Sequence, residues 1–300
     1  MKPFCRKYTR REIYMKFIKK AAALLLAFLM LLVPATALAD ETNVTDTTTA
    51  ESFVCYGDDL NSEQFEKVMN LLGADLSKDQ LIKVTIDDEK ALLGSIISAD
   101  KIGSRSLSSA RVTLTGEGTG ISVTTQNINW VTSSMYSSAL ATAGVDNARI
   151  VVAAPVEVSG TAALAGILKA YESAASTQLS DEAKAVAGSE MVLTGDLADM
   201  IGSDDAVELL AMVKNAIAEY HLDDYDSLRP YVEQGAKQLG VQLTEDQIDQ
   251  ITKLGVQIAK LDLDPEKLAG QLNGLVDNIQ KIQKVQQSGG SIFTNIKTAV

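Results

Sequence analysis

The chain has 300 residues, of which 27 are basic and 39 are acidic, so that its formal net charge is −12 at pH 7. Residues 1–39 hold eight of the basic residues and one acidic residue, which leaves residues 40–300 with a formal charge of −19. An acidic domain of this kind repels nucleic acid and anionic lipid, and the sequence shows no local basic patch, so we expect no nucleic acid as a partner.

The first predicted element is an export signal over residues 1–39. Basic residues are frequent in 1–20, the run 21–33 is uninterruptedly apolar, and small residues follow Pro34 up to Ala39. A signal peptidase reads this architecture. The apolar run has 13 residues, short of the roughly 20 that a spanning helix needs. We therefore expect a mature chain that begins at Asp40, lies outside the cytoplasm and keeps no stable membrane span after cleavage.

The mature chain is predicted to begin with a flexible leader. Residues 40–51 are polar and low in complexity, a composition that does not fold by itself. Cys55 is the only cysteine after the predicted cleavage site, so no internal disulfide can form and the fold must rely on its hydrophobic core. Because Cys55 lies in an apolar run, we expect it to be a small buried side chain.

Residues 52–158 are predicted to form an α+β region. Apolar and β-branched runs alternate there with helical patterns at 62–72 and 133–143. The strand-like runs are 52–56, 81–86, 111–115, 121–126 and 148–154. About five strands with helices between them indicate a small α+β sandwich.

Residues 159–287 lose the strand pattern and are predicted to be all-helical, with a polar tail at 288–300. Capping side chains precede helix-forming sequence at Ser180, Ser203, Thr244 and Asp264. About five or six helices are expected after residue 160. The fold class is therefore α/β, with an α+β N-terminal half and an all-helical C-terminal half.

The last predicted helix carries one continuous apolar stripe. Its residues fall at alternating steps of four and three, and they are Leu268, Leu272, Leu275, Ile279 and Ile282. The stripe is short for a coiled coil, so the simplest interpretation is packing on the protein's own core. A partner helix or a membrane surface is the alternative.

Catalytic side chains are scarce in this sequence. His221 is the only histidine, which excludes histidine-rich metal sites and leaves any catalytic triad dependent on one imidazole. The acidic cluster at 219–226 offers oxygens of the kind that calcium binds, but it lacks the spacing of a helix–loop–helix calcium site. Ser98 and Lys101 match the Ser-x-x-Lys pattern of penicillin-interacting enzymes without the companion motifs. The sequence thus favours a non-catalytic protein without cofactor or metal.

One candidate binding site is the segment Ser159, Gly160 and Thr161. It follows a predicted strand and opens a predicted helix, where free backbone N–H groups and hydroxyls can hold an anion. Helix capping and close helix packing explain the same residues without a ligand.

A second candidate is the turn around Trp130, the only tryptophan. Asn127 and Asn129 lie beside it and can bond to neighbouring backbone to shape the turn, which leads into a helix that Thr132 is expected to cap. Trp130 is either a plug in the core or a surface on which a sugar stacks.

The same stretch closely resembles a known family. The motif Asn127-Ile128-Asn129-Trp130-Val131-Thr132, with Met135-Tyr136, residues 139–145 and residues 152–164, resembles the YpuA-like exported proteins of Gram-positive bacteria, classed as domain of unknown function 1002. Residues 56–60 with Gln64, and residues 102–105, are also similar to that family. The likeness runs from about residue 52 to 285. It implies association with the cell envelope and supplies no catalytic residues.

From these observations we expect a secreted, envelope-associated interaction module. Its partner would be an envelope protein or a wall polymer, bound through the Trp130 turn or the last helical stripe. One alternative is a cell-wall hydrolase or transferase that uses carboxylates such as Asp58 and Asp59, although adjacent residues at a strand end normally point apart. A second alternative is a protein that binds calcium or an anionic wall polymer.

Overall fold

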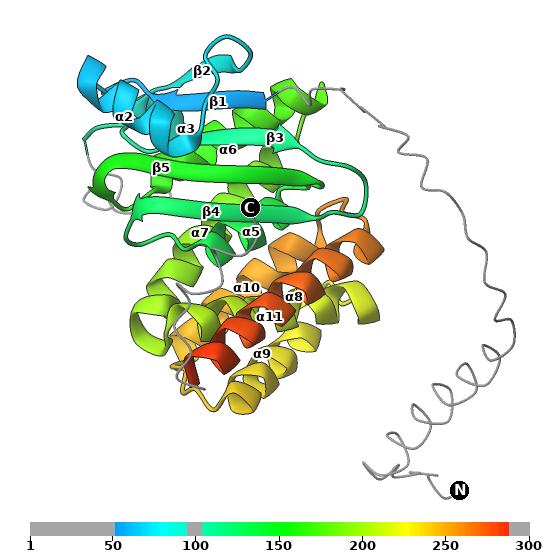
Figure 1. Cartoon of the computed structure of the whole chain (residues 1–300). Helices are drawn as coiled ribbons and strands as arrows, with labels where there is room; N and C mark the ends of the chain where they lie inside the picture. Colours follow the sequence, from blue (N-terminus) through cyan, green and yellow to red (C-terminus); the bar gives the residue numbers. More distant parts are fainter. Residues whose placement is uncertain (1–51, 95–103, 288–300) are drawn as a thin grey trace, which may run out of the picture. The chain divides into compact units, whose positions relative to one another are not determined.

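The computed structural model describes residues 52–94 and 104–287. Within these ranges the chain forms a five-stranded sheet and nine helices (Figure 1). The strands are β1 (Ser52–Gly57), β2 (Gln80–Val84), β3 (Ser109–Leu114), β4 (Ile121–Ile128) and β5 (Ala148–Val158). The helices are α2 (Ser62–Leu72), α3 (Ile86–Leu93), α5 (Ser133–Thr142), α6 (Thr161–Ala175), α7 (Asp181–Ile201), α8 (Ser203–Tyr220), α9 (Tyr225–Leu239), α10 (Glu245–Ala259) and α11 (Pro265–Gln287).

The sheet is mixed, with the strand order β2-β1-β3-β5-β4. β1 with β2 and β4 with β5 are parallel pairs, while β3 is antiparallel to both of its neighbours. β2 and β4 are therefore the two edge strands. Successive side chains of β1 point to opposite faces of the sheet, and the two faces pack against different helices. Val54 packs with α2, whereas Phe53 and Cys55 pack with residues of α5 and α6.

One glycine sets how closely α6 approaches the sheet. A Cβ atom added at Gly166 of α6 would lie 2.6 Å from Cys55 Sγ, a separation too short for a real contact. The absence of a side chain at this position therefore lets the helix lie directly on β1. Cys55 is fully buried there, as expected, and its thiol donates to the carbonyl of Ala110 at 3.3 Å.

The sheet and the helical half share one hydrophobic core. Its largest cluster runs from Phe53 in β1 through Met191 in α7 and Val207 in α8 to Ile279 in α11. A second cluster joins α7, α8, α9 and α10 around buried residues such as Leu209 and Ile251. The fold is α/β, as predicted, with the sheet in the N-terminal half and helices dominating the C-terminal half.

Several local predictions agree with the structure and two do not. Thr132, Ser180 and Thr244 cap their helices, and Asp264 accepts from the first backbone N–H groups of α11. The prediction for Ser203 is wrong, because Gly202 takes the cap position without a side-chain hydrogen bond.

The predicted strand 81–86 also extends too far. β2 ends at Val84, and Thr85 caps α3 together with Asp88. Helix α3 was not predicted.

Several predicted features lie outside the described residues. They are the export signal at 1–39, the leader at 40–51, the Ser98 and Lys101 pair, and the tail at 288–300. Among the described helices, none is both long enough and apolar enough to cross a membrane.

Candidate functional site

The two predicted binding segments lie side by side. The backbone N–H of Asn129 donates to the carbonyl of Val158 at 3.0 Å, and that of Val131 donates to the carbonyl of Ser159 at 3.0 Å. Asn127 adopts a positive φ of 58°, and its side-chain amide donates to the carbonyl of Ala154 at 2.8 Å. The Trp130 turn is thus fastened to the end of β5 and the start of α6.

Trp130 lies against α7. Its side chain is half-buried at the edge of the main core cluster. A Cβ atom added at Gly195 would be 2.3 Å from the indole ring, so the ring packs directly on the helix backbone at this glycine. Asn129, next to it, is exposed.

The start of α6 contacts an acidic residue of α3 that sequence reasoning missed. Gly160 caps the helix with φ of 95° and no side-chain cap, and the Tyr136 hydroxyl donates to its carbonyl oxygen. Ser159 Oγ and Thr161 Oγ1 are 3.2 Å apart, and the Thr161 hydroxyl donates to the carboxylate of Glu89 in α3. The hydroxyl that we expected to assist an external anion is therefore engaged by a carboxylate of the chain itself.

Glu89 is an unusual carboxyl group. It is fully buried, and its Oε2 atom makes no hydrogen bond within the described part of the chain. Burial raises the pKa of Glu89 from 4.5 to about 7, although the hydrogen bond from Thr161 opposes the shift. No sequence signal marked this residue, because α3 itself was not predicted.

A second buried polar cluster joins α5, α7 and α8. Lys214 Nζ lies 2.7 Å from Glu190 Oε1, and both side chains are 0% exposed. Lys214 also donates to Ser138 Oγ at 2.8 Å, and the hydroxyls of Ser138 and Thr142 donate to Glu190. Burial lowers the pKa of Lys214 and the charge of Glu190 opposes this shift. With no exposed atom, the cluster is structural and cannot meet a ligand.

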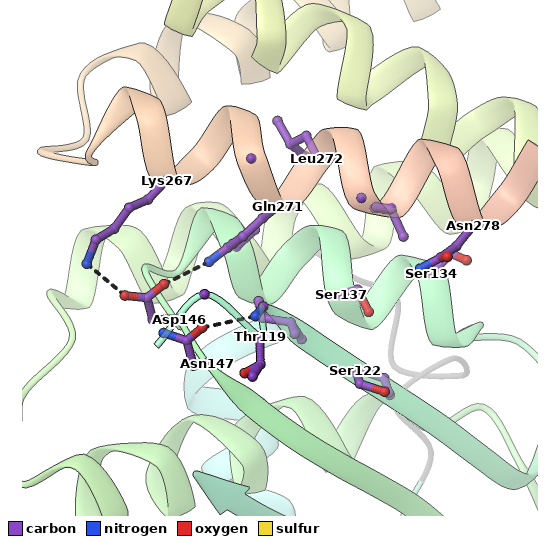
Figure 2. Close-up of a pocket in the computed structure, with 18 of the residues that line it drawn as sticks. Thr119, Ser122, Ser134, Ser137, Asp146, Asn147, Lys267, Gln271, Leu272 and Asn278 are labelled. Atoms are coloured by element: carbon purple, nitrogen blue, oxygen red, sulfur yellow. Dashed lines mark hydrogen bonds and ion pairs between the residues drawn. The ribbon is translucent and has the colours of Figure 1, made fainter. Parts of the chain in front are cut away.

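Other residues of α5 border an open groove of about 830 Å³ between β4, α5 and α11 (Figure 2). Apolar atoms make up the larger part of its lining, from side chains such as Val123 and Leu275. Hydroxyl and amide side chains lie among them, and they include Thr119, Ser122, Ser134, Ser137, Asn147 and Asn278. The arrangement suits a ligand that combines apolar groups with hydrogen-bonding groups.

One end of the groove is braced by polar contacts (Figure 2). Lys267 Nζ lies 2.8 Å from Asp146 Oδ2, and Gln271 Nε2 donates to Asp146 Oδ1 at 3.2 Å. The side chain of Asn147 accepts from the backbone N–H of Gly120 at 2.9 Å. Asp146 also raises the pKa of Lys267, because its carboxylate accepts a hydrogen bond from the ammonium group. These contacts connect the first turns of α11 to the strand ends.

The α11 wall of the groove contains two glycines. Gly270 and Gly274 lie four residues apart and therefore on one face of the helix. Nothing lies within 4 Å of a Cβ atom built at either position. The missing side chains therefore widen the groove.

None of the six predicted binding residues lines the groove. Its walls come from 117–123, 133–147 and 267–281, segments that share no local motif. The glycine pair in the last predicted helix was the one available signal. The stripe of that helix packs on the protein's own core, as the simplest interpretation predicted, because Leu268, Leu272 and Ile279 are buried against the rest of the chain. Leu275 is only partly buried and lines the groove. The side chain of Ile282 lies outside the described residues.

The other candidate groups have simple structural roles. Asp58 pairs with Lys83 at 2.8 Å, while Asp59 accepts from the backbone N–H of Ser106 at 2.7 Å. His221 is exposed at the C-terminal cap of α8. Among the described residues, no group of three or more acidic, histidine or cysteine side chains is placed to hold a metal ion.

Comparison with known proteins gives two matches. The family model described as "Protein of unknown function (DUF1002)" matches residues 56–275. The chain is also 36% identical over 256 residues to the "Uncharacterized protein YpuA" of Bacillus subtilis (strain 168), an alignment that covers 85% of this chain and 86% of that protein. No solved structure matches the chain.

Proposed function

The chain belongs to the DUF1002 family of proteins of unknown function, and from this premise we propose that it is a non-catalytic binding module of the cell envelope. The groove between β4, α5 and α11 is its binding site. The observation that carries the proposal is the groove itself, which is open, about 830 Å³ in volume and lined by apolar surface with several neutral hydroxyl and amide side chains. Binding pockets for small ligands fall in this range of size.

The location outside the cytoplasm rests on the sequence. Residues 1–39 have the basic, apolar and small-residue zones of an export signal. The acidic composition of residues 40–300 keeps a protein soluble and disfavours binding to anionic polymers through its long-range field. A neutral or mixed-charge partner therefore fits better than an anionic wall polymer.

The chemistry of the groove favours binding over catalysis. Its charged side chains are Glu117, Asp146, Lys267 and Lys281. Asp146 and Lys267 neutralise each other at 2.8 Å, so no acid–base pair is presented to a ligand. The carboxylates of the alternative hydrolase hypothesis, Asp58 and Asp59, have partners of their own outside the groove.

The proposal is tested with the complete chain in living cells. A photoreactive amino acid replaces Asn278 in the groove, and a matched variant carries it at Gln234, an exposed position of α9. We expect the protein in the extracytoplasmic fraction and a discrete adduct from position 278 that position 234 does not give. Identical adducts from both positions, or protein confined to the cytoplasm, would overturn the proposal.

A second measurement addresses the absence of catalysis. Purified wall material is incubated with the protein, and the released fragments are separated. We expect the fragment profile to match that of untreated wall. New fragments that depend on the protein would show an enzyme.

A further inference from the structure

We propose that the groove binds an extended peptide segment of a partner protein, which adds as a further strand along the free edge of β4. This inference rests on the proposed function and specifies its ligand. It starts from the place of β4 at the end of the strand order. Such an edge offers a row of backbone donors and acceptors to a new strand.

The register identifies which backbone groups are available. The backbone N–H of Ala148 in β5 donates to the carbonyl of Gly120 at 3.1 Å, and β4 runs parallel to β5 from the Ile121–Ala148 pair onward. In a parallel ladder the N–H and C=O groups of alternate residues point to the same side. The groups of Ile121, Val123 and Thr125 therefore point away from β5, toward the open edge.

β4 has little of the usual protection of an edge strand, since its one irregularity, between Gln126 and Ile128, lies at the end away from the groove. Natural edges are shortened, or carry charged residues or proline, to prevent pairing with other chains. β4 has eight residues, and none of them is charged or a proline. The opposite edge strand, β2, has five residues and contains Lys83. The chain thus protects one edge and leaves the other ready to pair.

The groove supplies the space that a strand would need. A neighbouring strand lies about 4.8 Å away in the hydrogen-bonding direction, and the groove runs beside Ile121, Ser122 and Val123. Across it, Gly270 and Gly274 place no side chain between α11 and the edge. An extended backbone can therefore lie between the strand and the helix.

The lining chemistry favours a peptide over a sugar. No aromatic ring lines the groove, so the stacking surface that sugars prefer is missing. Ser134 and Asn278 offer both donors and acceptors, which peptide groups on the outer side of the added strand can use. Ser137, whose hydroxyl donates to the carbonyl of Ser133 at 3.0 Å, offers an acceptor.

The charges at the groove also fit a peptide with opposite charges at its ends. Lys281 lines the groove, is exposed and makes no ion pair with another described residue. It comes three residues after Asn278, which lies beside Ser134 at one end of the groove in Figure 2. Glu117, which is exposed in the turn before β4, lies near the other end. We therefore expect the partner segment to carry an acidic group at the Lys281 end and a basic group at the Glu117 end.

The test uses fluorescently labelled peptides and the chain from Asp40 onward, which contains every described residue. One probe is Lys-Thr-Val-Thr-Val-Thr-Val-Asp with blocked ends, and the other is the reversed sequence. We expect saturable binding of one of them, and the sequence that binds reports the strand direction. No binding of either peptide would overturn the inference.

Backbone methylation separates strand addition from simple docking. Methyl groups are placed on the amide nitrogens of one alternating set of residues, or on the complementary set. Because only one set faces β4, we expect one methylated peptide to lose at least tenfold in affinity and the other to bind nearly unchanged. Equal effects of the two patterns would overturn strand addition.

Protein variants localise the site. Gly270→Leu with Gly274→Leu fills the groove without touching β4 and should reduce peptide affinity at least tenfold while the melting temperature is maintained. Asp277→Leu, at an exposed position of the same helix outside the groove, should bind as the unchanged chain does. Unchanged affinity of the double variant would overturn the inference.

Two outcomes separate this inference from the proposed function. A photoadduct of a wall polymer at position 278, with no binding of either peptide, would support the proposed binding function and overturn the inference that the ligand is a peptide. A dimer that dissociates in the Gly270→Leu, Gly274→Leu variant would assign the edge to a second copy of the chain and would also overturn the partner peptide.

Discussion

Helix α5 carries two sets of hydroxyl groups, and the two sets have different roles. Ser138 and Thr142 close around the buried pair of Lys214 and Glu190. Ser134 and Ser137 line the open groove. Ser134 and Ser138 are four residues apart and therefore lie on neighbouring turns of one face, so the elements packed against each turn decide the role of its hydroxyl. Where α7 and α8 supply matching charges the hydroxyls build structure, and where the groove opens toward the glycines of α11 the hydroxyl of Ser134 remains available to a ligand.

The largest expected effect comes from removing the cation of the buried cluster. Lys214→Met leaves Glu190 without its counter-charge in the interior, which should lower the free energy of unfolding by about 3–5 kcal/mol. The corresponding fall in melting temperature is on the order of 10 °C. Urea and thermal unfolding measure both quantities. Adding Glu190→Leu to Lys214→Met should recover most of the loss, and a double variant as unstable as the single one would contradict this account.

A matched pair of serine variants tests the comparison directly. Ser138→Val removes hydrogen bonds from both Lys214 and Glu190, which should lower the free energy of unfolding by about 1–3 kcal/mol. Ser134→Val, one turn earlier on the groove side, should change it by less than about 0.5 kcal/mol. Urea unfolding of the two variants in parallel is the measurement. Equal losses would mean that both sets of hydroxyl groups on α5 are structural.

Glu89 is a buried acid like Glu190, but its hydrogen-bonding partner is the hydroxyl of Thr161 and not a lysine. Because burial raises its pKa from 4.5 to about 7, the folded chain holds this proton more tightly than the unfolded chain does. The stability contributed by the protonated form is complete below about pH 4.5 and is lost as the pH rises through about 7. Glu89→Gln should therefore stabilise the protein by about 1–3 kcal/mol at pH 8 and change it little at pH 4.5.

The control for this pH dependence is Glu63→Gln, at an exposed position in α2. Stability is followed by urea unfolding between pH 4.5 and 8. If the Glu89→Gln variant keeps the same slope of stability against pH as the unchanged chain, the buried carboxyl is not the group that titrates.

The smallest expected effect is a gain at the two glycines of the groove, and a third glycine provides the contrast. Gly270→Ala and Gly274→Ala each add a Cβ atom in open space and should raise the free energy of unfolding by about 0.5–1 kcal/mol, because alanine is the better helix former. Gly166→Ala adds the same atom 2.6 Å from Cys55 Sγ and should lower it by about 1–3 kcal/mol. Thermal unfolding compares the three variants. A loss from Gly270→Ala would show that the groove is filled by a part of the chain itself.

Local chemistry explains which parts of the fold were predictable. Thr244 lies three residues before Gln247, which completes a capping box, and that spacing is visible in the sequence. Thr132 was predictable only as a capping residue type before a helical pattern, because the residue three positions later is Met135. The boundary between β2 and α3 was missed because Ile86 continues the apolar run of the strand. Thr85 and Asp88 form a capping box of the less common type with aspartate.

The sites depend on contacts that no local pattern contains. Lys214 and Glu190 lie on helices that carry several other charged residues, and only the packing of α5, α7 and α8 buries these two. The groove joins residue 117 to residue 281. Residues so far apart along the chain form no periodic pattern or fixed spacing from which the groove could be predicted. The glycine pair was visible, but its open surroundings were not.

The contact between Cys55 and Gly166 provides a built-in reporter of conformational opening. Burial raises the pKa of the Cys55 thiol to about 12, so the closed protein presents neither access nor thiolate to an alkylating reagent. In the chain from Asp40 onward this is the single thiol. The rate at which an alkylating reagent modifies Cys55 then reports how often α6 separates from β1, without any added probe.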